Sequence, residues 1–259
     1  MNDAARAYDA VAPAYDTLFV ERGRRTWSAL YEPYLRPGTR VIDAGCGTGA
    51  DSLLAARRGC VVRGFDVSPG MLEVASRRAV GHAIELQVGR LEDVGELYPS
   101  GSADVVLSGF AALNTCGDLP RFGAGCSRVL APGGLLILHF LTPGGLYDRV
   151  GNLARGRPGL ALGAWRERRV AVQIGSVGVG HTLIAPSRAE ALLARGDFER
   201  VAQHQVGMLT PDDGPTRVPE RVVRVLDAVE ARLRAVHALA AWGRFAVLVL
   251  RRRGGPSVR

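Results

Sequence analysis

The residues with the clearest chemical potential form a glycine-rich loop after a short apolar segment. Residues 41–49 read Val-Ile-Asp-Ala-Gly-Cys-Gly-Thr-Gly, so an acid, Asp43, precedes Gly45, Gly47 and Gly49. The apolar start predicts a buried strand, and residues 50–58 predict a helix with leucine and alanine on its apolar face. A glycine loop between a strand and a helix is the context in which backbone N–H groups approach a nucleotide-like ligand.

Two kinds of ligand fit this loop. The spacing Gly45-x-Gly47-x-x-Ala50 satisfies the dinucleotide fingerprint, in which bare backbone approaches a pyrophosphate. However, Asp43 lies directly before the glycines, and a carboxylate at that place repels a pyrophosphate. The same carboxylate suits a ligand that carries an ammonium and a sulfonium group. The sequence therefore favours a cationic ligand over a dinucleotide.

A second acid ends the next predicted strand. Asp66 follows the apolar run from residue 61 and precedes Ser68 and a proline. An acid at this offset from the glycine loop is placed to accept both hydroxyls of an adenosine ribose. A helix N-cap is the alternative role for Asp66, but Ser68 is better placed for it. Met71, one turn later, packs either on an adenine face or in the core.

The loop after the third predicted strand supplies groups for an adenine edge. Glu92 is the carboxylate expected to accept from the exocyclic amine, and the backbone N–H of Leu91 is expected to donate to a ring nitrogen. Asp93 has the simpler alternative of capping a helix.

Alternating strands and helices are expected to position these residues. Strands are predicted at residues 40–43, 61–66, 83–88, 103–108 and 135–141, and helices at 50–58, 69–79 and 119–130. The Pro-Gly-Gly at 132–134 predicts a sharp turn into the fifth strand. This alternation predicts a parallel sheet with helices on both faces. Ligands then bind at the carboxyl ends of the strands, where Asp43, Asp66 and the step from Ser108 to Gly109 fall.

The chain is expected to divide into four segments. Residues 1–35 predict an N-terminal helical cap, and 36–142 the ligand-binding core. Residues 143–186, rich in glycine and arginine, are interpreted as an insertion after the fifth strand that acts as a substrate lid, with surface embellishment as the alternative. Residues 187–259 complete the sheet with a sixth strand, a long helix at 219–240 and a final strand at 245–250.

Composition narrows the setting and the partners. The formal net charge is +8 and all 33 basic residues are arginines, scattered except for short clusters at 166–169 and 251–253. Neither cluster alternates with aromatic residues, so the pattern argues against nucleic acid as a partner. The four cysteines have neither metal-site nor disulfide spacing, which predicts no metal and a cytoplasmic protein. The longest apolar stretch, residues 235–250, is too short and too polar for a membrane span.

Taken together, these motifs resemble the class I S-adenosylmethionine-dependent methyltransferases, in the branch that acts on small molecules. The resemblance rests on residues 41–50, on the segment from Phe65 to Leu72, on the strand 104–108 and on the Pro-Gly-Gly at 132–134. The opening Tyr8-Asp9-x-x-Ala12-x-x-Tyr15-Asp16 is also similar to the helical start of that branch. The resemblance covers residues 8–141 well and the remainder poorly.

The resemblance implies a fold and a set of donor contacts. The fold is Rossmann-like, with a seven-stranded, mostly parallel sheet whose last strand is reversed, and the cofactor is S-adenosyl-L-methionine. The glycine loop with Asp43 surrounds the methionyl part, and Asp66 holds the ribose. Gly109 and Phe110 approach the amino-acid end, and Tyr15 reaches the donor from the N-terminal cap. Arg90 stands where many relatives carry an acid, so the adenine contact either shifts to Glu92 or is made by backbone alone.

Methyl transfer is an in-line displacement that needs a base only if the acceptor must lose a proton. His139, late in the fifth strand, is the candidate base, although a buried structural histidine is the simpler interpretation. No motif identifies the acceptor atom or the oligomeric state. Alternatives that stay open are RNA or protein methylation, a different reaction of the same donor, and a donor-binding module without turnover.

Overall fold

A single seven-stranded sheet forms the centre of the molecule. The computed structural model describes residues 3–18, 21–162, 168–174, 177–194, 197–209, 219–234, 236, 239 and 242–254. The strands are β1 (Arg40–Ala44), β2 (Val61–Asp66), β3 (Ile84–Val88), β4 (Ala103–Ser108), β5 (Leu130–Leu141), β6 (Arg168–Ile174), β7 (Val177–Leu183), β8 (Phe198–Val206) and β9 (Phe245–Arg252). Seven of them form the sheet in the order β3-β2-β1-β4-β5-β9-β8, and β6 and β7 form a separate hairpin.

The sheet has the predicted direction as well as the predicted number of strands. The pairs among β1 to β5 are all parallel, whereas β9 is antiparallel to both β5 and β8. The last strand in the chain is therefore the reversed one, as the resemblance implied. Because β1 lies between β2 and β4, the chain changes winding direction there, and such switch points open a crevice at the carboxyl ends of the strands.

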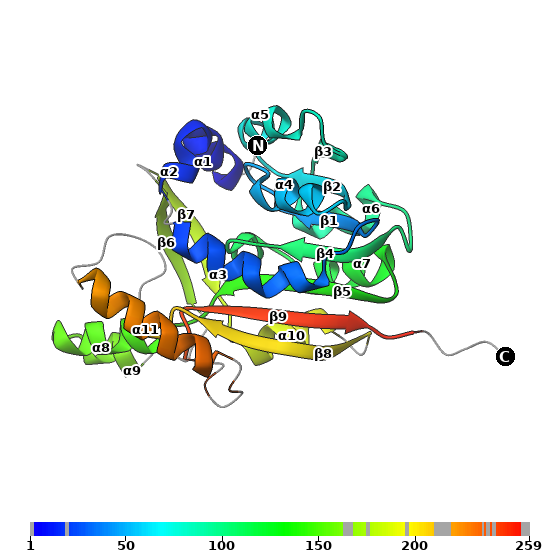
Figure 1. Cartoon of the computed structure of the whole chain (residues 1–259). Helices are drawn as coiled ribbons and strands as arrows, with labels where there is room; N and C mark the ends of the chain where they lie inside the picture. Colours follow the sequence, from blue (N-terminus) through cyan, green and yellow to red (C-terminus); the bar gives the residue numbers. More distant parts are fainter. Residues whose placement is uncertain are drawn as a thin grey trace.

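Helices cover both faces of the sheet (Figure 1). The α-helices are α1 (Asp3–Val11), α2 (Tyr15–Leu18), α3 (Glu21–Tyr31), α4 (Ala50–Arg57), α5 (Pro69–Ala79), α6 (Val94–Leu97), α7 (Leu119–Val129), α8 (Leu146–Ala154), α9 (Pro158–Leu162), α10 (Pro186–Ala194) and α11 (Glu220–Leu233). Short 3₁₀ turns are η1 (Ala12–Ala14), η2 (Glu32–Tyr34), η3 (Leu91–Asp93) and η4 (Ala112–Thr115).

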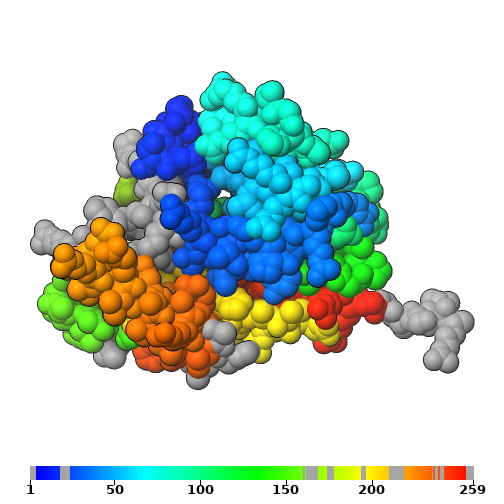
Figure 2. Space-filling view, viewed as in Figure 1, coloured from blue at the N-terminus to red at the C-terminus, as the bar shows by residue number. Residues whose placement is uncertain are grey.

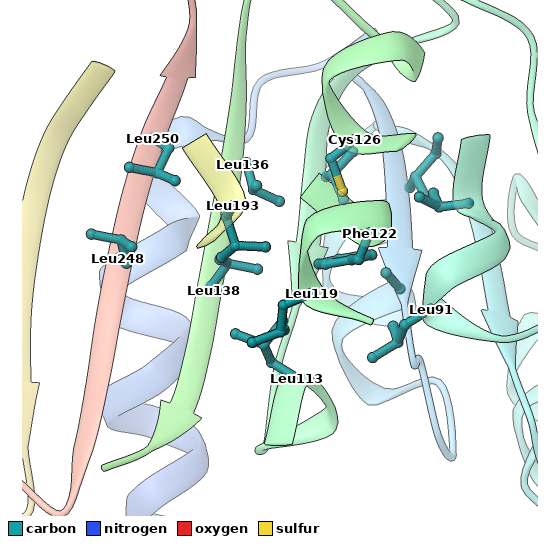
Figure 3. Packing of buried hydrophobic residues seen from close by; sticks show 14 of the residues in the cluster. Leu91, Leu113, Leu119, Phe122, Cys126, Leu136, Leu138, Leu193, Leu248 and Leu250 are labelled. Carbon is teal, nitrogen blue, oxygen red and sulfur yellow. The ribbon is translucent and has the colours of Figure 1, made fainter. Parts of the chain in front are cut away.

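Alternation along the strands divides the core into two layers. Ile137 of β5 joins Trp27 and Tyr31 of α3 on one face. Its neighbours Leu136 and Leu138 point to the other face, where residues of α7 and α10 pack. Figure 3 shows this second layer, with Leu136 and Leu138 facing Leu193 and Phe122 close by. The period of two in a strand buries both faces at once, which fits a sheet covered by helices on each side.

The fifth strand begins earlier than predicted. The Pro-Gly-Gly at 132–134 was expected to be a turn before the strand, but β5 runs from Leu130. Leu130 pairs with Ala103 and Leu135 pairs with Val105, so residues 131–134 form an irregularity inside the pairing. Gly133 has a φ of 79°, a conformation that glycine adopts without steric cost. The predicted turn is present, but because the residues on both sides of it pair with β4, it forms a bulge within β5.

The long C-terminal helix buries a different face from the one its apolar residues indicate. The helix is confirmed from Glu220 to Leu233, while part of its predicted end, at residues 235, 237, 238 and 240, lies outside the described residues. Val222, Val225 and Val229 are exposed, whereas Val223 and Glu230 are buried. Glu230 accepts hydrogen bonds from three backbone N–H groups at residues 207–209. These bonds, rather than the valine stripe, orient the helix. Among the described residues, no helix combines the length and apolar character needed to cross a bilayer.

Two segments from distant parts of the sequence meet above the carboxyl edge of the sheet. The N-terminal helices α1 and α2 lie beside α5, and the hairpin β6–β7 extends to them (Figures 1 and 2). Ala7 and Val11 of α1 pack with Val179 of β7 and Met71 of α5. The N-terminal segment and the hairpin thus form a roof over the sheet edge.

Candidate functional site

A cavity lies under this roof, at the carboxyl ends of β1, β2 and β4. The empty space inside it is about 930 Å³, part of which is open to solvent. Its floor is the glycine loop with Asp43 and Asp66, and its upper wall includes Tyr8 and Tyr15. Eleven residues were expected to contact the donor, and all of them except Gly49 line the cavity: Tyr15, Asp43, Gly45, Gly47, Gly49, Asp66, Met71, Leu91, Glu92, Gly109 and Phe110.

 The twelfth predicted site residue, His139, was expected to act on the acceptor, and its position is given below.

Asp66 closes the second strand with its carboxylate held from two sides. The backbone N–H of Gly47 donates to Oδ2 over 2.9 Å and that of Ser68 donates to Oδ1 over 2.9 Å. Burial raises the pKa of Asp66, while these two bonds work in the opposite direction. Ser68 itself caps α5, since its hydroxyl accepts from the backbone N–H of Met71. The capping role therefore falls to Ser68, as predicted, and Asp66 faces the cavity.

The three glycines of the loop have different physical roles. Gly45, Gly47 and Gly49 all have positive φ, at 73°, 52° and 76°. Gly45 and Gly47 line the cavity, and a side chain at Gly47 would project into open space. A Cβ at Gly49 would lie 2.9 Å from the Cβ of Ala75 in α5. Gly49 thus permits the close approach of α5 to the loop, and it acts on the cavity only through that packing.

Two buried carboxylates, Asp43 and Asp51, line the end of the cavity next to α3. Asp43 accepts a 2.6 Å hydrogen bond from the hydroxyl of Ser52. Burial, and secondly the charge of Asp51, raises the pKa of Asp43 to about 7. Asp51 accepts from the indole N–H of Trp27 at 2.7 Å and from the hydroxyl of Tyr31 at 2.8 Å. This pair is an electronegative pocket that fits a cationic group.

Asp51 was not predicted from the sequence. Its pKa is raised by burial, and the bonds from Trp27 and Tyr31 oppose that shift. Its position, two residues after the last glycine of the loop, is the one available signal. That signal was not sufficient, because the two donors come from α3, 24 and 20 residues earlier.

A charge network anchors the N-terminal segment to the site. Asp16 forms an ion pair with Arg24 at 3.1 Å and a second one with Arg78 of α5. The hydroxyl of Thr48, in the glycine loop, donates to Asp16 over 2.9 Å. Arg24 also lies over the ring of Phe110, 4.8 Å from its centroid, and lines the cavity. Arg24 was not predicted as a site residue either, because it lies in no recognisable motif.

The opposite end of the cavity is less charged. Met71 and Leu91 are buried and line this wall. Glu92 accepts from the guanidinium of Arg90 at 3.1 Å and from the backbone N–H of Gly117 at 2.8 Å. The pKa of Glu92 is lowered, because the bonds from Arg90 and the backbone outweigh the burial that raises it. Glu92 is therefore an ionised acceptor beside an apolar wall.

The loop after β4 has a strained backbone beside the acidic pocket. Phe110 and Ala111 have φ values of 45° and 65°, which non-glycine residues rarely adopt. A Cβ at Gly109 would lie 2.6 Å from Oδ2 of Asp51. The absence of a side chain at Gly109 therefore leaves room for the bond between Asp51 and Trp27. Strain of this kind is found at functional sites, where the surrounding structure maintains it.

His139 lies behind the cavity and not among its lining residues. Its ring stacks between Trp27 and Phe245, with centroids at 5.2 and 4.7 Å, and meets the edge of Phe110. Burial lowers the pKa of His139 to about 3, and its Nδ1 has no hydrogen-bond partner among the described residues. The geometry argues against the predicted role as a base. His139 instead packs against the ring of Phe110.

Similar proteins show the family to which this chain belongs. A family model described as a methyltransferase domain matches residues 42–138. A malonyl-[acyl-carrier protein] O-methyltransferase of Serratia marcescens is 38% identical over 112 residues, which cover 43% of this chain and 42% of that protein. A demethylmenaquinone methyltransferase of Symbiobacterium thermophilum is 32% identical over 172 residues, which cover 61% and 67%. The chain thus spans between two fifths and two thirds of the length of these relatives.

Solved structures share the fold at lower sequence identity. An S-adenosylmethionine-dependent methyltransferase from Mesorhizobium loti has a TM-score of 0.57 at 18% identity, over 87% of this chain and 97% of that one. The [4+2]-cyclase SpnF has a TM-score of 0.64 at 19% identity, over 97% and 96%. At such identities the likeness concerns the fold alone. The family match and the sequence relatives, together with the glycine loop and its two strand-end acids, show that this chain belongs to the class I S-adenosylmethionine-dependent methyltransferases.

Proposed function

We propose that this protein transfers a methyl group from S-adenosylmethionine to a small-molecule acceptor. The observation that carries the proposal is the charge pattern of the cavity. Asp43 and Asp51 lie at one end, where they fit the donor's ammonium, and Arg24 lies near them, where it fits the donor's carboxylate. Asp66 is left to accept from the ribose hydroxyls. The residues present therefore match the charged and polar groups of the donor in kind.

The adenine is assigned to the far wall of the cavity. Met71 and Leu91 provide apolar surface, and Glu92 provides an ionised acceptor for the exocyclic amine. Tyr15, Gly109 and Phe110 complete the donor site as the walls nearest the N-terminal cap and the loop after β4.

When bound, the donor supplies an activated methyl group on a neutral leaving group. The protein then has to exclude water, fix the direction of attack and, for some acceptors, remove a proton. The roof of α1, α2 and the hairpin β6–β7 serves the first task, which gives residues 143–186 the role of a substrate lid. The buried carboxylates and Arg24 serve the second, because they fix both charged ends of the methionyl group.

Two observations favour a small acceptor. The cavity lies under the roof rather than on an open face, and the sequence relatives include proteins named for demethylmenaquinone and nocamycin. The arginine cluster at 251–253 lies at the other edge of the sheet, since Arg251 pairs with Leu135 near the amino end of β5. That cluster cannot form a basic track into the cavity. We also place the protein in the cytoplasm, in keeping with its four free cysteines.

The first experiment is calorimetric titration with S-adenosylmethionine and S-adenosylhomocysteine. We expect both to bind, and we expect Asp66→Ala to weaken binding by about tenfold or more, because it removes a half-buried acceptor of charge-assisted hydrogen bonds. Glu73→Ala is the matched control, since Glu73 is an exposed carboxylate that pairs with Arg77 in the same helix. Absence of binding by the parent protein would refute the proposal.

The second experiment follows the fate of the methyl group. Incubation with isotope-labelled donor and a panel of small phenols, enols, carboxylic acids, amines and thiols, with products read by mass spectrometry, should show one labelled methyl group on an acceptor. Donor consumption without methylated product would favour a different reaction. Binding of RNA with a steep salt dependence would instead favour a macromolecular acceptor.

A further inference from the structure

A tyrosine and a histidine meet where the roof of the cavity closes. Tyr8 of α1 lines the cavity, and its phenolic oxygen is 3.5 Å from Nε2 of His181 in β7. The side chain of His181 is 2% exposed. This distance is long for a hydrogen bond, but catalytic hydrogen bonds are often long before the substrate arrives and shorten in the complex.

The second nitrogen of His181 fixes which way the proton moves. Nδ1 is 3.0 Å from the carbonyl oxygen of Val179. A carbonyl oxygen only accepts, so Nδ1 carries the ring proton of the neutral imidazole. Nε2 is then the bare nitrogen, and Tyr8 is the donor of the pair.

The surroundings keep both groups in these protonation states. Burial lowers the pKa of His181, with the bond to Val179 opposing the shift. Burial raises the pKa of Tyr8 well above its usual value, and the nearby Tyr15 and Asp66 raise it further. At neutral pH the ring is therefore uncharged and able to accept, while Tyr8 retains a proton to give.

The other ionisable groups of the cavity are committed to other tasks. Asp43, Asp51 and Asp66 are assigned to the donor. Burial raises the pKa of the thiols of Cys46 and Cys116, so neither is a base at neutral pH. Tyr8 lines the cavity and lies within hydrogen-bond reach of a neutral nitrogen base.

Resting on the proposed function, we propose that Tyr8 and His181 form a proton relay for an acceptor with a weakly acidic hydroxyl, a phenol or an enol. The acceptor O–H proton passes to the Tyr8 oxygen as the Tyr8 proton passes to Nε2 of His181. The acceptor oxygen forms a bond to the methyl carbon, and the carbon–sulfur bond breaks with its electron pair left on sulfur. The products are a methyl ether, a neutral thioether and an imidazolium, so the positive charge moves from sulfur to His181. Carboxylates and thiolates are already ionised and gain little from such a relay.

The kinetic test compares hydroxyl and thiol acceptors of the same shape. With p-cresol, acetylacetone and 4-methylbenzenethiol as probes, we expect Tyr8→Phe and His181→Gln to slow methylation of the phenol and the enol by about 100-fold. The thiol rate and the affinity for S-adenosylhomocysteine should change less than threefold. The pH profile of kcat for the hydroxyl acceptors should lose its acidic limb in His181→Gln. His82→Gln, on an exposed turn, is the control and should match the parent protein.

A second measurement is independent of any acceptor. The chain has five histidines, so their ring nitrogens can be resolved by NMR after ¹⁵N-histidine labelling. We expect His181 as the Nδ1–H tautomer, with an Nε2 signal that moves in Tyr8→Phe. An Nε2–H tautomer, equal loss of thiol and phenol methylation in the variants, or methylation confined to amines or thiols would each overturn the relay. So would a complete lack of methylated phenol and enol. If the parent protein does not bind the donor, the proposed function is refuted instead. The NMR measurement still reports the tautomer of His181 in that case.

Discussion

At the residue scale, the carboxyl of Asp43 is buried, and in the proposed function it contacts the ammonium group of the donor. Burial and the neighbouring Asp51 raise its pKa to about 7, so it holds a proton through much of the acidic range. A bound ammonium reverses the preference, because the nearby positive charge stabilises the ionised form. The other titratable groups near it are Asp66, Tyr31, Cys46 and Tyr98. Donor binding is therefore coupled to proton release.

This coupling predicts a pH dependence of donor affinity. Below pH 7 the free site is protonated and must lose its proton to bind, so affinity should fall as the pH falls, by on the order of tenfold between pH 7 and 5.5. The donor's own ammonium stays charged over that range. Calorimetry at the two pH values checks this, and Asp43→Asn should remove the dependence. Asp104→Asn, at the exposed ion pair with Arg40, should keep it. Equal affinities for the parent protein at both pH values would contradict the assignment.

At the scale of elements, the glycine loop is as much a packing device as a ligand site. Gly49 is the N-cap of α4 and has a positive φ. α5 passes so close to it that Ala75 leaves no room for a side chain at this position. The same α5 is held at its start by Asp9 of α1, which accepts from the hydroxyl of Ser68 and the backbone N–H of Gly70. The loop, α5 and the N-terminal roof are thus mechanically connected.

Gly49→Ala should therefore destabilise the protein more than backbone strain alone predicts. The strain at positive φ costs about 1 kcal/mol or more, and the clash with Ala75 adds to it. Gly101→Ala is the control, since Gly101 has a φ of 65° but open space around its Cα. Urea denaturation measures both free energies of unfolding. Equal losses would mean that α5 yields freely and that the packing role of Gly49 is wrong.

Arg78 should matter to donor binding although it lies outside the cavity. It donates to the carbonyl and hydroxyl oxygens of Thr48 at 3.0 Å and pairs with Asp16. Arg78→Ala removes the link between α5, the loop and the roof, so we expect donor affinity to fall several-fold and the N-terminal segment to be cut faster by protease. Arg77→Ala, one residue earlier and paired only with Glu73, should change neither. Parent-like proteolysis and affinity in Arg78→Ala would show that the Asp9 hydrogen bonds and the apolar packing hold the roof without Arg78.

For the whole molecule, the two core layers determine stability and the roof determines access. The layer beneath α7 and α10 joins β1, β4, β5 and β9 into one apolar mass. Phe122 lies fully buried in it, and the neighbouring Gly123 lets α10 approach, since a Cβ there would lie 2.5 Å from the carbonyl oxygen of Leu193. The site residues at the sheet edge depend on this mass for their positions but do not belong to it.

Phe122→Ala should cost about 3–5 kcal/mol of unfolding free energy, because it leaves a cavity in a layer packed from several elements. Val80→Ala, at a position 79% exposed, should stay within about 0.5 kcal/mol. Thermal and urea unfolding compare the two. A loss below 1 kcal/mol at Phe122 would show that the layer collapses around the gap.

The sequence by itself determined the parallel sheet, the loop and the two acids at the ends of β1 and β2, because these depend on neighbours along the chain. Strand periodicity, turn glycines and a serine cap are local signals, and they placed Asp43 and Asp66 at one edge. The tertiary structure alone decided the partners that come from far away. Asp51 is fixed in the site by hydrogen bonds from Trp27 and Tyr31. His139 stacks on Phe245 and so does not line the cavity. Tyr8 contacts His181, which lies 173 residues later in the chain. The physical reason is that burial, charge and proton direction depend on which surfaces meet, and the chain's local pattern does not encode those meetings.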